Sequence, residues 1–200
     1  ASDFFSIQVN GVEAHSGVNP ELGLSSIKIA SEIITKIKTG RINKNTTINI
    51  GKINGGSAIN IIPGQTTMSC EIRGHNEKTI SNQLATIKKL LTRTEKKYKK
   101  FDKRVSIKFK KERIYDSINI KRDSMLVKRI LKTCKDLKYK IDLVETGGGA
   151  DANFFVKNGV NTVNLGTGMR EFHTKNEKLI LKEFYQSADI VFNCLLERVN

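Results

Sequence analysis

Residues 47–73, TINIGKINGGSAINIIPGQTTMSCEIR, decide the fold, because they hold two alternating segments separated by turns. In Thr47–Ile53 and again in Thr66–Arg73, apolar and polar side chains alternate, as they do in strands with one buried face. The pairs Gly55-Gly56 and Pro63-Gly64 are typical of the turns between extended pieces. The stretch therefore predicts two strands of an antiparallel sheet.

The segments on either side extend this sheet into a larger pattern. We expect a strand, a helix, a second helix and a strand at residues 4–12, 24–37, 80–91 and 105–109. Gly40 is expected to close the first helix in a C-cap position. Two helices over a four-stranded antiparallel sheet form the split βαβ, ferredoxin-like arrangement. The sequence thus predicts an α+β ferredoxin-like (βαββαβ) domain over residues 1–116.

From residue 117 the pattern changes to alternating helices and strands. Helices are expected at 123–137, 151–159 and 179–198, and strands at 141–144 and 160–165. Alternating units with glycine-rich loops after the strands are typical of an α/β layered sheet. Two parallel strands cannot cover their own faces. Residues 117–200 are therefore predicted to be a partial α/β layer, one portion of a larger domain.

Composition excludes several classes of protein. Hydrophobic residues make up 38% and charged residues 28% of the 200, which argues against a disordered chain. No apolar run approaches the roughly 18 residues of a membrane span, and no secretory signal is visible at Ala1. Cys70, Cys134 and Cys194 lie far apart, which argues against a disulfide framework and a thiolate zinc site. We expect a cytoplasmic protein with reduced thiols and no membrane contact.

The formal net charge of +15 suggests a nucleic-acid ligand, but its distribution weakens that interpretation. Residues 77–116 hold 14 basic and 5 acidic side chains and thus most of the excess. A solvated lysine-rich face is the simpler explanation, and polyanion binding stays an alternative. The βαββαβ order also occurs in RNA-recognition modules, which stack bases on aromatic side chains of the central strands. Thr66–Arg73 has no aromatic residue, so RNA binding is the weaker hypothesis.

Few residues are candidates for chemistry. His15 follows the first strand and His173 follows the last expected strand, whereas His75 lies in a strand-to-helix turn. A catalytic metal site needs at least three protein ligands, and no local set of that size is present. Arg73 is a natural partner for a carboxylate, and Asn60 for a peptide group. The triple glycine at 147–149 would let a ligand approach the backbone and the start of the next helix.

Together these motifs resemble a known family. His15-Ser-Gly-Val-Asn-Pro-Glu, Gly55-Gly-Ser-Ala-Ile-Asn-Ile-Ile-Pro63 and Glu71-Ile-Arg-Gly-His75 resemble the lid, or dimerisation, domain of the di-zinc peptidase and deacylase family. Gly147-Gly-Gly-Ala-Asp-Ala-Asn153 and Leu165-Gly-Thr-Gly-Met-Arg-Glu-Phe-His-Thr174 resemble the C-terminal end of its catalytic domain. The branch that looks most similar is the peptidase T-like one. That family includes tripeptidases, carboxypeptidase G, aminoacylases and succinyl-diaminopimelate desuccinylase.

The resemblance implies a role for each matching residue. His173 matches the last metal ligand, a neutral imidazole on one of two zinc ions. His15 matches the lid histidine that reaches into the partner subunit's active site and stabilises the oxyanion. Asn60 and Arg73 match residues that hold the backbone and terminal carboxylate of a short peptide substrate, and Gly148 and Gly149 match the loop that lines the pocket. It also implies a homodimer formed through the lid.

The other ligands of that family, a His-x-Asp motif, a bridging aspartate and a Glu-Glu pair, are not found in the 200 residues. The resemblance therefore implies the C-terminal part of a di-zinc exopeptidase, whose N-terminal portion would precede Ala1, and a chain that is inactive by itself. A non-catalytic dimerisation or binding module stays an alternative.

Overall fold

In a computed structural model, which describes residues 1–196, the chain forms two compact units, residues 1–117 and 118–200. The last helix expected from the sequence reaches Glu197 and Arg198, which lie outside the described residues. Among residues 1–196, no helix has the length and hydrophobicity that crossing a bilayer requires.

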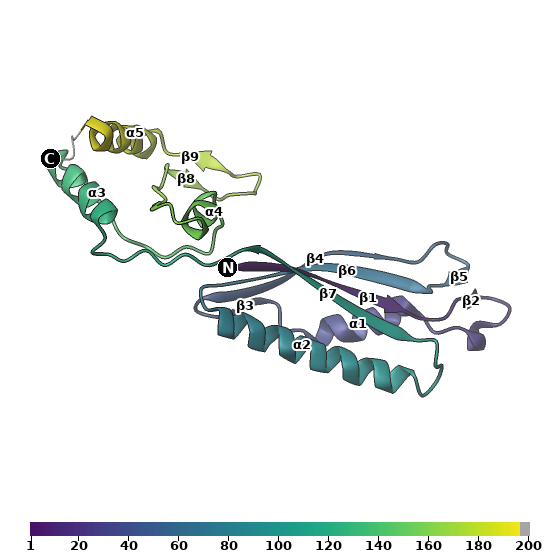
Figure 1. The fold of residues 1–200 in the computed structure, drawn as a ribbon. Helices are drawn as coiled ribbons and strands as arrows, with labels where there is room; N and C mark the ends of the chain where they lie inside the picture. Colours follow the sequence, from purple (N-terminus) through teal and green to yellow (C-terminus); the bar gives the residue numbers. More distant parts are fainter. Residues whose placement is uncertain (197–200) are drawn as a thin grey trace. The chain divides into compact units, whose positions relative to one another are not determined.

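The first unit contains a five-stranded antiparallel sheet (Figure 1). In spatial order its strands are β3 (Gly40–Asn43), β4 (Thr46–Gly55), β6 (Gln65–Gly74), β1 (Ser2–Asn10) and β7 (Ser106–Tyr115). In the register of the central strand β1, Ile7 lies opposite Met68 of β6 and Phe109 of β7. The alternation seen in the sequence therefore points one row of apolar side chains from each strand toward the same face.

Two helices cover that apolar face, α1 (Ser26–Lys36) and α2 (Glu77–Tyr98) (Figure 1). Their starts are fixed by side chains: the Ser25 hydroxyl accepts a hydrogen bond from the amide of Lys28, and the Asn76 side chain accepts one from the amide of Thr79. The core between helices and sheet includes the fully buried side chains Ile7, Ile29, Ile33, Met68, Ile72 and Ile80. Each such isoleucine stabilises the fold by about 2 kcal/mol. The mixed α+β class predicted from the sequence is confirmed.

One strand and one cap differ from the sequence prediction. Gly40 is not the C-cap of the first helix, because α1 ends at Lys36 and Ile37 is its C-cap. Ile37 is 6% exposed, and its amide donates to the carbonyls of Ile33 and Ile34 in the last turn. Gly40 instead opens β3 with a φ of +75°, a left-handed conformation that glycine adopts without a steric penalty. Gly40 thus begins the β3–β4 hairpin, and β3 is a fifth strand beside the four that the sequence predicts.

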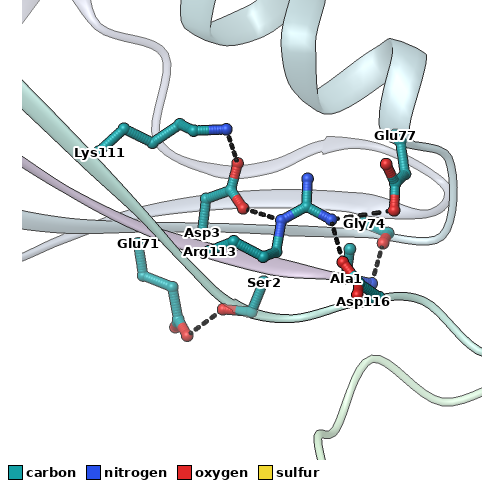
Figure 2. Close-up of polar contacts among 9 residues, drawn as sticks. All are labelled: Ala1, Ser2, Asp3, Glu71, Gly74, Glu77, Lys111, Arg113 and Asp116. Atoms are coloured by element: carbon teal, nitrogen blue, oxygen red, sulfur yellow. Dashed lines mark hydrogen bonds and ion pairs between the residues drawn. The ribbon is translucent and has the colours of Figure 1, made fainter. Parts of the chain in front are cut away.

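A buried ion cluster ties the start of β1 to the end of β7 (Figure 2). The Asp3 side chain is fully buried and is paired with Arg113 and, at 3.1 Å, with Lys111. Arg113 also reaches Glu77 at the start of α2, at 2.9 Å, and Asp116 at 3.0 Å. The cluster therefore connects β1, β7, α2 and the residues where the first unit ends.

A second polar cluster joins the two helices. Glu32 of α1 accepts hydrogen bonds from Lys36, 2.6 Å away, and from Lys97 and Tyr98 of α2 at 2.7 and 2.8 Å. These bonds, that of Lys36 first, lower the pKa of Glu32 to about 2. Burial, followed by the bond to Glu32, raises the pKa of Tyr98 to about 12. Because the pKa of Glu32 is lowered, this stabilisation is present at neutral pH and is lost as the pH falls toward 2.

The second unit has two longer helices, a short helix and a small hairpin. They are α3 (Met125–Asp136), α4 (Ala152–Lys157), β8 (Met169–Arg170) paired with β9 (Lys178–Leu179), and α5 (Leu181–Leu196). α3 packs against α5, and the buried apolar residues of the unit are Val127, Cys134, Ala152 and Ile190. Many large apolar side chains stay exposed, including Val144 at 79% and Leu195 at 78%.

The strands expected at 141–144 and 160–165 are absent from the described structure, so these two strand predictions are wrong. Residues 141–144 are largely exposed and 160–165 are about half exposed, and neither segment pairs with another strand among the described residues. A strand exists only through hydrogen bonds to a neighbour, and a run of apolar residues does not by itself provide one.

Candidate functional site

The structure brings His15 and Asn60 together. His15 ends β2 (Ala14–His15), which pairs with β5 (Ile61–Ile62) so that His15 lies opposite Ile61. The amide of Ser16 donates a hydrogen bond to the carbonyl of Asn60 at 2.9 Å, which closes this small ladder beside Asn60. Both side chains are exposed. The ladder therefore holds a histidine and an asparagine as neighbours at one end of the first unit.

The hydrogen bonds of His15 also assign its tautomer. The amide of Gly17 donates to Nδ1 of His15 at 3.2 Å, so Nδ1 acts as an acceptor and carries no proton. In the neutral imidazole the proton then lies on Nε2, which is left as a hydrogen-bond donor. A donor of this kind can stabilise an oxygen that gains negative charge during a reaction.

Arg73 is not part of this pair. It lies near the end of β6, whereas Asn60 and His15 lie beyond the other end, which begins at Gln65. At about 3.4 Å per residue the strand separates the two positions by about 27 Å. Nε of Arg73 forms an ion pair with Glu71 at 2.8 Å. Figure 2 shows the hydrogen bond that Glu71 also accepts from Ser2. The expected carboxylate partner is thus a side chain of the same strand.

Sequence reasoning missed Glu71 as that partner. The signal was available, because residues two apart in a strand point to the same face of the sheet. Glu71 and Arg73 have this spacing on an alternating strand whose other row, Met68, Cys70 and Ile72, is buried.

Gly148 and Gly149 are exposed in a loop that belongs to no helix or strand. The loop uses some of its amides internally: Gly148 donates to the Thr146 hydroxyl at 3.2 Å, and Ala150 donates to the buried Asn153 side chain at 3.0 Å. The helix that follows, α4, has only six residues and Asp151 at its N-cap makes no side-chain bond there. This arrangement gives weak support to an anion site at the helix start.

His173 lies in the turn between β8 and β9, a hairpin that sequence reasoning did not detect because each strand has only two residues. Its side chain is exposed, and its backbone has a φ of +61°. Left-handed backbone at a residue with a Cβ costs about 1 kcal/mol. The turn offsets this cost, because the His173 amide donates to Glu177 at 2.9 Å and the Thr174 hydroxyl to the Glu171 carbonyl at 2.8 Å.

A single imidazole does not make a metal centre. Among residues 1–196, no three His, Cys, Asp or Glu side chains are close enough together to hold a metal ion. A zinc site needs three or four protein ligands, so the described residues do not fit a complete site.

Comparison with known proteins identifies the first unit. Residues 2–99 match the family model of the M20 peptidase dimerisation domain. The protein YqjE of Bacillus subtilis is 33% identical over 181 residues, which are 90% of this chain and 47% of that protein. Among solved structures, aminopeptidase PepT of Bacillus cereus superposes with a TM-score of 0.80 at 30% identity, over 96% of this chain and 50% of that one.

A tripeptidase of Staphylococcus aureus is similar as well, with a TM-score of 0.83 at 27% identity, and again 96% of this chain matches 50% of that one. The chain thus spans about half the length of the relatives it matches. Its match to the two peptidase structures extends across both units, whereas the family model covers the first. Residues 2–99 are therefore a dimerisation domain of the M20 peptidase family, and the chain corresponds in structure to one half of a peptidase T-like enzyme.

Proposed function

We propose that this chain supplies the lid and one metal ligand of a zinc-dependent exopeptidase that cleaves short peptides. The observation that supports this function most is the similarity to an aminopeptidase and a tripeptidase over 96% of the chain. His173 is the proposed ligand and Gly148 and Gly149 line the proposed pocket. In this proposal other polypeptide supplies the remaining ligands, because no three candidate ligands lie together among residues 1–196.

The lid residues have separate proposed tasks. His15, with its proton on Nε2, donates a hydrogen bond to the oxyanion that forms on the scissile carbonyl. Asn60, next to His15 in the β2–β5 ladder, holds the peptide backbone of the substrate. Arg73 binds the terminal carboxylate, for which it must exchange its ion pair with Glu71.

The separation within the first unit supports a homodimer. His15 and Asn60 lie about 27 Å along the sheet from Arg73, too far for one short peptide to reach both. Arg73 is at the end of the sheet from which the chain leaves for the second unit, since it pairs with Ser2, and Ser2 pairs with Tyr115. We propose that His15 and Asn60 serve the active site of a second copy of the chain, and that a different active site uses Arg73.

The surface proposed for this pairing is the edge of the sheet at β4. β3 covers only the first residues of β4, through Thr46–Ile48, so residues 51–55 have an open edge. Ile53 is 48% exposed there, and Ile27 of α1 is 40% exposed and lies against Gly55. The opposite edge strand, β7, carries the basic residues Lys108, Lys110, Lys111 and Arg113. Two copies of this edge would repel each other.

Light scattering on the 200-residue chain tests this interface. We expect a mass of twice 22.4 kDa at micromolar concentration. A lysine in place of Ile27 brings an unpaired charge into the interface and should raise the dimer dissociation constant at least about 100-fold. Phe101→Lys is the matched control, because Phe101 is 72% exposed just after α2 and the same charge there should leave the dimer intact. A chain that is monomeric at 100-fold higher concentration would contradict the proposed dimer.

A hydrolysis assay tests the peptidase function. The complete natural gene product, loaded with zinc, is expected to release the N-terminal amino acid from a tripeptide. A chelator should abolish the release and added zinc should restore it. The N-acetylated tripeptide is the control, because an enzyme that acts on the free N-terminus should leave it uncut. Dimer formation without any tripeptide cleavage would favour the non-catalytic binding module instead.

A further inference from the structure

Two cysteines that the proposed function does not use lie in one helix interface. Cys134 of α3 is 2% exposed and is among the buried residues of that helix. On α5, Ile190 is the buried residue, and Cys194 follows one turn later on the same face. The Cys194 thiol donates a hydrogen bond to the hydroxyl of Thr133, the residue before Cys134, at 3.3 Å. Both sulfur atoms therefore lie where α3 packs against α5.

The two thiols differ in access. Cys194 is partly exposed, whereas Cys134 is buried. Burial, together with the neighbouring Cys194, raises the pKa of the Cys134 thiol, which lowers its share of reactive thiolate. An oxidant can thus reach the partly exposed Cys194 before the buried Cys134, whose neighbour Thr133 accepts the hydrogen bond of the Cys194 thiol.

We propose that Cys134 and Cys194 form a redox modification site, which takes a glutathione-type disulfide and closes into an intramolecular disulfide between α3 and α5. The Cys194 thiolate attacks one sulfur of oxidised glutathione, forms a mixed disulfide and releases one reduced glutathione. The Cys134 thiolate then attacks Cys194 Sγ, forms the internal bond and releases the second reduced glutathione. Two protein thiols are oxidised and one glutathione disulfide is reduced.

The consequence of the bond would reach the hairpin that carries His173. α5 begins at Leu181, directly after β9, and Glu183 in its first turn holds Arg170 of β8 at 2.7 Å. The amide of Ile180 donates to the carbonyl of Gly168 at 2.9 Å. A covalent tie between α3 and α5 therefore fixes the helix on which this hairpin rests.

Cys70 provides a control within the same chain. It lies on β6 in the first unit, is 5% exposed, and burial raises its pKa to about 12. A thiol of this kind stays protonated at neutral pH and is a poor nucleophile. We expect it to remain free under conditions that oxidise the pair.

The test incubates the 200-residue chain with oxidised glutathione, blocks the remaining thiols in acid, and maps the peptides without reduction. We expect a linked peptide that joins Cys134 to Cys194, a mass lower by two hydrogens, and one blocked thiol at Cys70. In Cys134→Ser the mixed disulfide has no second thiol, so one glutathione should stay on Cys194. In Cys194→Ser, oxidation at Cys134 should be at least about 10-fold slower, and Cys70→Ser should behave as the wild type.

The proposal is overturned if the linked peptide is absent, if Cys70 reacts as fast as Cys194, or if Cys134→Ser traps no glutathione. Because the wild-type peptide map alone identifies the bond, a variant that folds poorly does not remove the test. The readout needs no peptidase activity, so it is independent of the proposed function.

Discussion

Replacing His173 by alanine in the complete natural gene product should lower kcat/KM for a tripeptide by at least about 100-fold. Removing a residue that only orients a metal ligand already lowers metal affinity or activity 10–100-fold, and loss of the ligand itself should cost more. The side chain is exposed in a turn whose hydrogen bonds use the backbone of His173 and not its ring. The fold should therefore tolerate the change. Zinc bound per chain, measured by mass spectrometry of the metal, should fall together with the activity.

His75→Ala is the matched control for that variant. His75 follows β6 in the turn before α2, in the first unit, and has no proposed part in metal binding or catalysis. Its variant should keep the zinc content and the activity of the wild type. If His173→Ala also kept both, the proposed ligand role of His173 would be wrong.

Replacing Asp3 by asparagine should lower the free energy of unfolding of the first unit by about 3 kcal/mol, in the range found when one partner of a buried ion pair is removed. The Asp3 carboxylate is fully buried between Arg113 and Lys111. The loss should stay near the lower end of the range, because Arg113 keeps Glu77 and Asp116 as partners. Urea denaturation followed by circular dichroism measures the change.

The control for Asp3 is Glu112→Gln, on the neighbouring strand β7. Glu112 lies opposite Phe4, on the face of the sheet away from the helices, and is exposed. An exposed carboxylate of this kind contributes less than about 1 kcal/mol, so the variant should unfold at nearly the wild-type urea concentration. Hydrogen exchange should show faster opening of β1 and β7 in Asp3→Asn alone. Equal stability of the two variants would show that the buried cluster does not stabilise the sheet.

The first unit could be predicted from its sequence because its signals are local. Alternation at Thr66–Arg73 gives β6, and the helical spacing from Ile80 to Leu91 gives α2. β3 was missed because its four residues carry only one apolar side chain, Ile42, and its pairing depends on the turn that Gly40 makes after the helix. Local periodicity carries no information on such a turn.

The second unit was predicted less well because its segments depend on distant partners. The run at 141–144 has strand-like composition, yet within residues 118–196 it lies unpaired and largely exposed. The β8–β9 hairpin was not predicted, because strands of two residues are too short to show a period. The side chains of Glu177 and Thr174 make hydrogen bonds within its turn. The position of His173 could be read from its motif, but its left-handed turn could not.

For the candidate site, too, the sequence predicted one part and only the structure shows the other. Sequence resemblance selected His15, Asn60 and Arg73, and the structure adds that only the first two are neighbours. Their proximity arises from the β2–β5 ladder, whose two-residue strands have no periodic signal. The distance to Arg73 follows from the length of β6, a strand that the sequence did predict.

The central claim is that His15 acts in the active site of a second copy of the chain, and mixing two inactive variants tests it most directly. In the complete natural gene product, His15→Ala and His173→Ala should each lower kcat at least about 100-fold. When the two proteins are unfolded together and refolded, half of the dimers are mixed, and each mixed dimer has one site with both histidines. Activity should then return to about a quarter of the wild-type value. If the refolded mixture stays as inactive as each variant alone, while light scattering shows that dimers have formed, the claim is contradicted.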